Sequence, residues 1–219
     1  MVVSRSETMW EEMDCVRCDT RYPGEYANLK DFITPKHLMV QDLAASFNGG
    51  IEERVFDIWR WVGENIKYPW MQDGYEYRRL EAFVEPLFVF HRPAVILESK
   101  GDFWDYPSEV LTIKVSDCDG TAFLLASLLL NHLGPDQVFA AVGNIYKGFP
   151  QGHAWVVVEM NGSHLILEST KKDFTNAVAP VEEVAAEYQP IYYANHEKMY
   201  RLSEGEILAK CYPCCPLWI

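Results

Sequence analysis

Three residues of this chain have side chains suited to nucleophilic catalysis, and their order suits one kind of reaction. Cys118 directly precedes an apolar run, His153 begins a second apolar segment, and Glu168 follows a third. A thiolate attacks carbonyl carbons, an imidazole moves protons, and a carboxylate orients the imidazole. These residue types in this order therefore indicate acyl transfer through a thioester, with Cys118 as the nucleophile.

The segment after Asp117 is expected to form the helix that holds this nucleophile. Asp117 is a typical N-cap residue and Gly134-Pro135 is a typical stop signal, which predicts a helix from Cys118 to about Leu133. Its body is apolar almost all round, as in central buried helices. Unpaired backbone N–H groups and the helix dipole lower the pKa of a thiol at a helix N-terminus. The predicted helix would therefore hold Cys118 rigidly where its thiolate is favoured.

Asn161-Gly162 lies between two apolar runs and predicts a hairpin with a two-residue type I′ turn. Counting back from this turn pairs Trp155 with Glu168 and His153 with Thr170. Side chains alternate faces along a strand, so these four residues share one face. Glu168 is then the diagonal neighbour of His153, about 7–8 Å away between backbones and within reach of a long side chain. A slip of one residue would turn Glu168 to the opposite face, so the predicted contact depends on the turn.

Three segments resemble one protein superfamily. Phe103–Gly120, with the apolar helix after it, is similar to the nucleophile region of the transglutaminase-like superfamily, and Gly152–Val156 is similar to its histidine strand. Ile51–Tyr68 resembles the helix that often precedes the core. The resemblance covers Ile51–Thr170. It implies a papain-like α+β fold, in which a central buried helix carrying the cysteine packs against an antiparallel sheet.

The same resemblance implies a catalytic triad of Cys118, His153 and Glu168. The sequence departs from the family pattern at three places. Ser116 stands where glycine is usual, Asp119-Gly120 stands where many microbial members have Glu-Asp, and Glu168 replaces the usual aspartate. The longer glutamate suits the diagonal spacing from His153, but its presence leaves the role of the orienting carboxylate open.

The leading functional hypothesis is an enzyme that acts on amide or isopeptide bonds of a protein or peptide substrate and needs no cofactor for catalysis. If water resolves the thioester, the enzyme is a peptidase or amidase; if a lysine-type amine resolves it, the enzyme is a cross-linking transglutaminase. Hydrolysis is preferred because the predicted core is compact, without the extra β domains of large cross-linking enzymes. The alternative of another class is a binding module that keeps the fold and performs no chemistry.

An acyl-transfer site also needs donors for the oxyanion that forms on the attacked carbonyl. The backbone N–H of Cys118 is one natural candidate because of its position at a helix start. The indole N–H of Trp104, upstream in the segment that resembles the family, is a second candidate. The competing interpretation is that Trp104 packs beneath the helix as part of the core.

Four further cysteines form two Cys-x-x-Cys pairs near the ends of the chain: Cys15 with Cys18, and Cys211 with Cys214. Four thiolates could hold one tetrahedral zinc ion and join the two ends. The long separation differs from a compact zinc finger, so free thiols remain an alternative. Disulfides are a third possibility that fits poorly with a chain lacking a secretion signal.

Composition narrows the class of protein. The chain has 219 residues, 49% of them hydrophobic, which suffices for a sizeable core in one domain. A net charge of −13 argues against nucleic acid or an anionic membrane as partner. No segment approaches the roughly 18 consecutive apolar residues of a membrane span, and the first residues lack a signal-peptide pattern. A cytoplasmic location is therefore expected, while the oligomeric state is left open.

The expected organisation is an N-terminal extension over residues 1–50, a transglutaminase-like core over 51–175, and a segment over 176–219 that completes the same domain. Hydrophobic spacing and turn signals predict the other elements. These are a helix from Thr34-Pro35 to about Phe47, an amphipathic helix from Ile51, a strand over Val138–Tyr146, a short helix over Val181–Tyr188, and a strand over Gln189–Tyr193.

Overall fold

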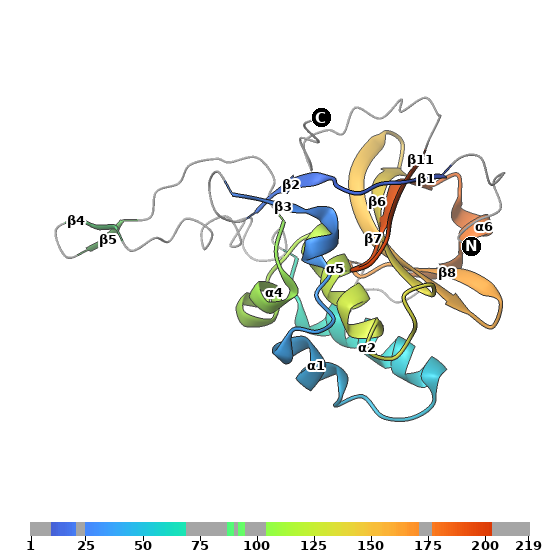
Figure 1. The fold of residues 1–219 in the computed structure, drawn as a ribbon, viewed down its shortest axis with the longest axis horizontal. Helices are drawn as coiled ribbons and strands as arrows, with labels where there is room; N and C mark the ends of the chain where they lie inside the picture. The colour runs from blue at the N-terminus through green and yellow to red at the C-terminus, as the bar shows by residue number, and fades with distance from the viewer. Residues whose placement is uncertain are drawn as a thin grey trace.

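The computed structural model describes residues 10–20, 25–68, 87–89, 92–94, 104–170 and 177–202. Its centre is an antiparallel sheet of seven strands in the order β1-β11-β10-β6-β7-β8-β9 (Figure 1). The α+β fold class predicted from the sequence is confirmed. The strands are β1 (Trp10–Glu12), β6 (Val138–Tyr146), β7 (Pro150–Met160), β8 (Ser163–Leu167), β9 (Val178–Pro180), β10 (Tyr188–Ala194) and β11 (Met199–Leu202).

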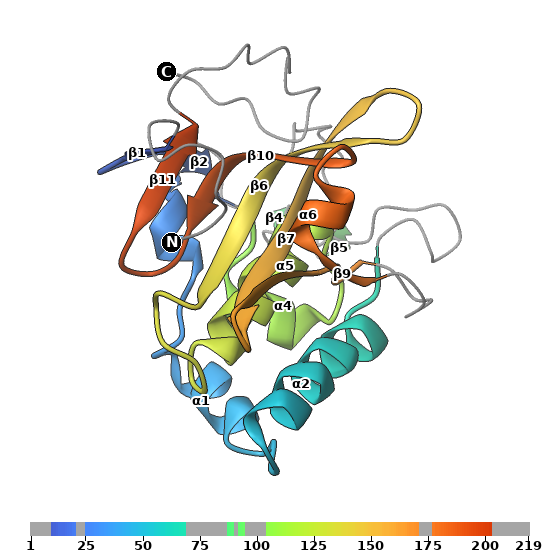
Figure 2. The ribbon, with the colours of Figure 1, turned by 90° about the vertical axis from the view of Figure 1, so that its right-hand side faces the viewer.

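Helices cover both faces of this sheet unequally. Figure 2 shows α4 and α5 behind the sheet, α1 and α2 below them, and the short α6 in front of the sheet. The front helix, α6, spans only Val181–Val184. The other helices that the structure describes are α1 (Leu38–Ala44), α2 (Ile51–Asn65), α4 (Pro107–Ile113) and α5 (Cys118–Leu129), with a short 3₁₀ helix at Leu29–Phe32.

The central helix α5 is enclosed by the rest of the fold. All of its residues are buried, as its continuous apolar sequence predicts. Asp117 takes the N-cap position in an extended conformation, but its side chain makes no capping hydrogen bond. The regular helix ends at Leu129, earlier than expected, although the Leu133 N–H still donates to the Leu129 carbonyl (2.9 Å). The start of the helix, which carries Cys118, lies where the sequence places it.

Strand β7 is apolar on both faces because both faces are covered. Ala154, Val156 and Val158 pack into the core that contains α5. Trp155 and Val157 face the other way, into a second core under α6. His153 precedes Trp155 by two residues on this strand, and its ring stacks on the ring of Trp155.

The predicted hairpin between β7 and β8 is confirmed. Asn161 and Gly162 both have positive φ, 53° and 76°, as a type I′ turn requires. The ladder pairs Met160 with Ser163 and continues to Val156 with Leu167 in the predicted register. It ends there, so the expected pairs of Trp155 with Glu168 and of His153 with Thr170 lie beyond the ladder.

Two predicted helices are shorter in the structure. The expected start at Thr34-Pro35 is wrong: α1 begins at Leu38, because residues 35–37 form a turn closed by the His37 N–H on the Thr34 carbonyl (3.1 Å). The expected helix over Val181–Tyr188 ends at Val184, because Tyr188 already belongs to β10. The strand over Val138–Tyr146 and the helix from Ile51 are confirmed.

Segments from both ends of the chain take part in the sheet. β1 pairs with β11 at one edge, and β10 lies between β11 and β6. Two small ribbons stand apart from it: β2 (Arg17–Asp19) with β3 (Tyr26–Asn28), and β4 (Leu87–Val89) with β5 (Arg92–Ala94). The predicted domain boundaries stay predictions.

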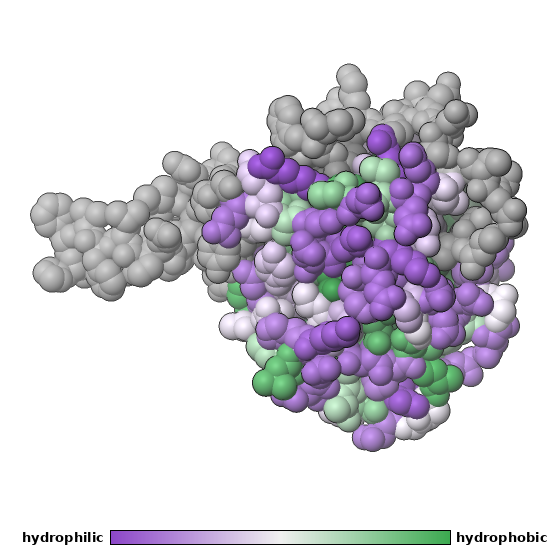
Figure 3. All heavy atoms as spheres, viewed as in Figure 1, coloured by the Kyte–Doolittle hydropathy of each residue, from purple (hydrophilic) through white to green (hydrophobic). Residues whose placement is uncertain are grey.

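The described part of the chain contains no helix that is both long and apolar enough to cross a membrane. Figure 3 shows one face of the molecule, where hydrophilic residues predominate and hydrophobic ones form small separate spots. Exposed large apolar side chains include Leu38, Ile51 and Phe149.

Candidate active site

Cys118 is the first residue of α5, and its thiol is almost fully buried at 4% exposure. The segment before it is fixed to the end of α2. The Ser116 N–H donates to the Lys67 carbonyl (3.1 Å), and the Lys67 N–H donates to the Lys114 carbonyl (2.9 Å). The backbone that leads into the helix is therefore held on both sides of Val115, which pairs with Lys67 in an isolated bridge.

A buried polar pair lies directly behind the nucleophile segment. The Ser116 hydroxyl donates to Asp105 Oδ2 (2.8 Å), and neither side chain reaches solvent. The space that this hydroxyl fills is the space that a side chain at position 120 would need, because a β-carbon on Gly120 would overlap Ser116 Oγ. Two departures from the family pattern, Ser116 and Gly120, are thus coupled by packing.

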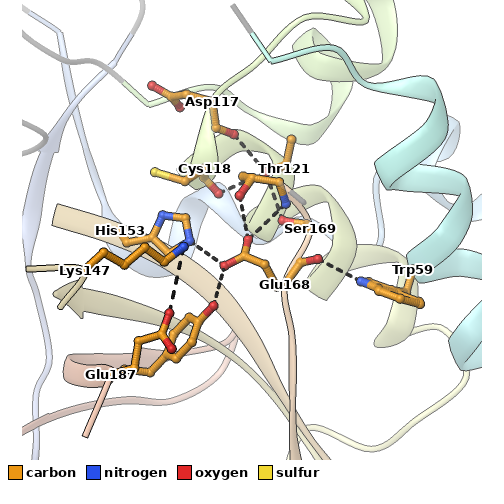
Figure 4. A network of polar contacts seen from close by, with 11 residues as sticks. Trp59, Asp117, Cys118, Thr121, Lys147, His153, Glu168, Ser169 and Glu187 are labelled. Carbon is orange, nitrogen blue, oxygen red and sulfur yellow. Dashed lines mark hydrogen bonds and ion pairs between the residues drawn. The ribbon is translucent and has the colours of Figure 1, made fainter. Parts of the chain in front are cut away.

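Glu168 is brought to His153 by a direct hydrogen bond. His153 Nε2 lies 2.7 Å from Glu168 Oε2, and the Tyr188 hydroxyl donates to the same oxygen (3.1 Å). The other oxygen, Oε1, accepts from the Thr170 N–H (3.0 Å) and the Thr170 hydroxyl (2.7 Å). Figure 4 shows the carboxylate at the centre of this network.

These contacts keep Glu168 ionised despite its burial. Burial alone would raise the pKa of the carboxyl group. The charge of His153 and the hydrogen bonds from His153 and Thr170 outweigh it and lower the pKa of Glu168 to about 2. A buried carboxylate that stays charged can orient the imidazole that is bonded to it, which is the role of the third group in a triad.

The backbone around Glu168 is tied to two helices. The Trp59 indole N–H of α2 donates to the Glu168 carbonyl (2.9 Å). The Ser169 hydroxyl donates to Thr121 Oγ1 (3.0 Å), and the Thr121 hydroxyl lies 3.1 Å from the Cys118 carbonyl. The carboxylate segment and the start of α5 are therefore coupled through neighbouring hydroxyls.

His153 stands between aromatic rings on the part of β7 that extends beyond its ladder with β8. Its imidazole stacks on Trp155 (centroids 6.1 Å apart, planes at 25°) and lies 6.4 Å from the Tyr188 ring. With Nε2 bonded to Glu168, Nδ1 is the nitrogen left for the thiol. In Figure 4 the Cys118 side chain and the His153 ring are drawn on the same side of Glu168.

Trp104 lies in the core. It is 2% exposed and packs against Phe123 of α5 (centroids 5.1 Å) and against Phe32 (5.6 Å). This is the packing role that the sequence offered as the alternative. That the Trp104 indole N–H also donates to the oxyanion stays a prediction.

The structure describes only half of the predicted zinc site. Cys15 is exposed and Cys18 is buried, with its thiol 3.7 Å from the Val16 carbonyl. Burial raises the pKa of Cys18, and the nearby Asp119 raises it further. Cys211 and Cys214 lie outside the described residues. Within the described ranges no three His, Cys, Asp or Glu side chains gather as a metal site, and zinc binding by the four cysteines stays a prediction.

Four residues around the candidate triad make contacts that the sequence reasoning did not predict. Thr170 could have been found, since a hydroxyl two residues beyond a carboxylate commonly bonds to it. Tyr188 and Trp59 arrive from distant segments, and no local pattern marks them. Asp105 lies in the segment that resembles the nucleophile region, but its bond to Ser116 was not predicted.

The profile of a family described as a transglutaminase-like domain matches residues 39–183, which is more than half of the chain. The chain belongs to this transglutaminase-like family. Membership supports a cysteine-based function at the level of the family and agrees with the α+β fold observed here. No curated protein matches the sequence.

The solved structures that match this transglutaminase-like chain share little of its sequence. A proposed cysteine protease from Cytophaga hutchinsonii is 16% identical with a TM-score of 0.40, over 69% of this chain and 45% of that one. LapG of Legionella pneumophila is 19% identical with a TM-score of 0.41, over 80% and 91%. A TGase is 17% identical with a TM-score of 0.37, over 68% and 33%. The chain thus spans less than half of the first and third structures.

Proposed function

We propose that the protein is a cysteine-dependent acyl-transfer enzyme that cleaves amide or isopeptide bonds of proteins or peptides, with Cys118, His153 and Glu168 as a triad. The observation that carries the proposal is the 2.7 Å hydrogen bond between His153 Nε2 and a buried, ionised Glu168. A histidine with only a structural role does not need a buried carboxylate that is itself held by four donors. A catalytic imidazole needs a fixed carboxylate, because its tautomer and orientation must be fixed.

The proposed reaction follows from these roles. The Cys118 sulfur attacks the carbonyl carbon, and the C=O π electrons move onto oxygen, where the Cys118 backbone N–H is a candidate donor. As the tetrahedral species collapses, the C–N bond breaks and the nitrogen takes a proton from His153. Water then attacks the thioester, giving its proton back to His153, and the C–S bond breaks to release the acid and restore the sulfur. Throughout, Glu168 holds the Nε2 side of the ring.

Hydrolysis is the proposed outcome because water as acceptor requires no binding site beyond the one that forms the thioester. A cross-linking enzyme needs a second site that positions an amine and keeps water away from the thioester. The two outcomes share the first half of the reaction. They differ only in which nucleophile reaches the acyl group.

The test is activity profiling of wild type and Cys118→Ala on a peptide and glycopeptide library, with primary amines offered as competing acceptors. The expected result is amide cleavage by wild type, a loss of at least about 10³-fold in Cys118→Ala, and little amine incorporation. Amine incorporation in place of cleavage would establish the cross-linking alternative.

A second measurement covers the case in which the library lacks the substrate. Wild type is treated with iodoacetamide at pH 6, and peptide mapping by mass spectrometry gives the labelling rate of each cysteine. We expect Cys118 to react fastest although it is buried, since ordinary thiols are protonated at this pH. A Cys118 that reacts no faster than exposed Cys15 would contradict the proposal and favour a silent binding module.

A further inference from the structure

Two donors meet at a single oxygen of Glu168. His153 Nε2 and the Tyr188 hydroxyl both bond Oε2, at 2.7 Å and 3.1 Å. Thr170 occupies the other oxygen with its N–H and its hydroxyl. The terminal torsion of a glutamate is soft, so a carboxylate with one partner can rotate about its Cγ–Cδ bond. Bonds to both oxygens remove that freedom.

Tyr188 is itself held firmly. It lies on β10 opposite Ile145 of β6 and is almost fully buried. Its ring meets Trp155 edge-on, with centroids 5.2 Å apart and planes at 75°. Burial, followed by the charge of Glu168, raises the pKa of Tyr188, so the hydroxyl keeps its proton. The sheet therefore presents a permanent donor to the carboxylate.

We propose that Tyr188 and Thr170 are positioning residues that lock the Glu168 carboxylate, so that it holds the Nε2 side of His153 and leaves Nδ1 for Cys118. The inference rests on the proposed function and adds to it two residues outside the triad. Neither side chain contacts the substrate in this scheme. Each acts through Glu168, by fixing its orientation and by favouring its ionised form.

The competing explanation is that Tyr188 is present only for the packing of its ring. The change Tyr188→Phe separates the two explanations, because it keeps the ring and removes only the hydroxyl. The matched control is Tyr193→Phe. Tyr193 is a buried tyrosine on the same strand, and its ring packs against Trp10 and Phe139.

The first measurement is the pH profile of kcat/KM for wild type and both variants. A hydrogen bond to a charged group contributes more than about one pKa unit, so Tyr188→Phe should move the acid limb upward by about one pH unit. We also expect kcat to fall about 10-fold with KM nearly unchanged, because the lost contact orients the reacting imidazole. Tyr193→Phe should keep the wild-type profile.

The second measurement does not use activity. Carbon-13 NMR of the glutamate side-chain carboxyl groups follows the protonation of Glu168 directly. We expect the Glu168 midpoint to rise in Tyr188→Phe relative to wild type and Tyr193→Phe. This shift would be seen even in a protein without amidase activity or a reactive Cys118, so failure of the proposed function and failure of this inference are distinguishable.

The second pair of variants keeps the proposal testable should Tyr188→Phe not fold. Thr170→Val removes a donor to Oε1, while Thr170→Ser retains the hydroxyl. We expect Thr170→Val to shift the acid limb and the carboxyl midpoint upward, and Thr170→Ser to restore both. Wild-type acid limbs and wild-type carboxyl midpoints in the folded hydroxyl-free variants would overturn the inference.

Discussion

Cys118 and Cys18 are both buried thiols, with 4% and 5% of their surfaces exposed, but their surroundings differ. Cys118 begins α5, and Figure 4 draws it in one view with the bonded pair of His153 and Glu168. Cys18 lies on β2, with its thiol against the Val16 carbonyl and its pKa raised by burial and by nearby acidic groups.

The comparison shows that exposure alone does not select a nucleophile. Both thiols lose solvent, which disfavours a thiolate. At Cys18 the neighbouring carboxylates of Asp119 and Asp19 add to that penalty. At Cys118 the helix N-terminus and an imidazole that can carry positive charge oppose it. We therefore expect the same burial to give one inert thiol and one reactive thiol, and the partners of Cys118 to account for the difference.

Removing the imidazole should have the largest effect on this contrast. His153→Ala deletes both the positive partner of the thiolate and the proton donor. We expect iodoacetamide labelling of Cys118 at pH 6 and amide cleavage to fall by about 10³-fold, within the range for general acid–base groups. Labelling of Cys18 should stay at its slow wild-type rate. Unchanged labelling of Cys118 would mean that the helix alone activates the thiol.

Removing the charge of Glu168 should have the next largest effect. Glu168→Gln keeps the size of the side chain but leaves the imidazole beside a neutral amide. We expect cleavage to fall about 10²-fold, because the ring loses its fixed tautomer and its charge partner. Thiol labelling should fall less than in His153→Ala, since the imidazole remains. If cleavage and labelling fell equally in the two variants, the whole effect of His153 would depend on the carboxylate of Glu168.

The same variant predicts a pH dependence of stability. The pKa of Glu168 is lowered from its usual 4.5 to about 2 in the folded protein. A lowered pKa contributes stability above pH 4.5, and this contribution is lost as the pH falls from 4.5 toward 2. Wild type should therefore exceed Glu168→Gln in free energy of unfolding by up to about 3 kcal/mol at neutral pH. Denaturant melts at several pH values should show this difference shrinking below pH 4.5, and a constant difference would contradict it.

A smaller effect is expected from the packing behind the nucleophile. Gly120→Ala places a methyl group where Ser116 Oγ lies. We expect a loss of about 1–3 kcal/mol in the free energy of unfolding, as for other overpacked cores, and slower labelling of Cys118. Adding Ser116→Gly should recover part of the stability, because it empties the contested space. No recovery in the double variant would show that the two positions are independent.

The features of the fold and site that could be predicted are those that depend on residues close together in the sequence. Contacts between distant segments could not be predicted. The apolar run predicted α5, and Asn161-Gly162 fixed the hairpin register that brings Glu168 toward His153. Both signals are local. The segment before α1 shows the opposite case: its Thr34 N–H donates to the Ser127 hydroxyl of α5 (2.9 Å), a contact between distant segments that no local pattern marks.

The donors around Glu168 show the same limit. Thr170 is two residues away and follows from local geometry. Tyr188 reaches the carboxylate only because β10 pairs with β6, which pairs with β7. That strand order is a property of the whole fold, and the residues of β10 do not encode it locally. Side chains that tune a site are therefore harder to predict than the triad itself.

The smallest effect should come from Cys18, the other half of the comparison. Cys18→Ala removes a buried sulfur and leaves the surroundings of Cys118 intact, so we expect cleavage and Cys118 labelling within about twofold of wild type and a stability loss of about 1 kcal/mol. Thermal melts and zinc analysis of the same preparations complete the test.

A much larger loss of stability together with released zinc would instead support the predicted site at Cys15, Cys18, Cys211 and Cys214, because a structural metal contributes directly to folding. A large loss of activity without zinc release would show that the two thiols are coupled, through the Asp119 that lies between their environments.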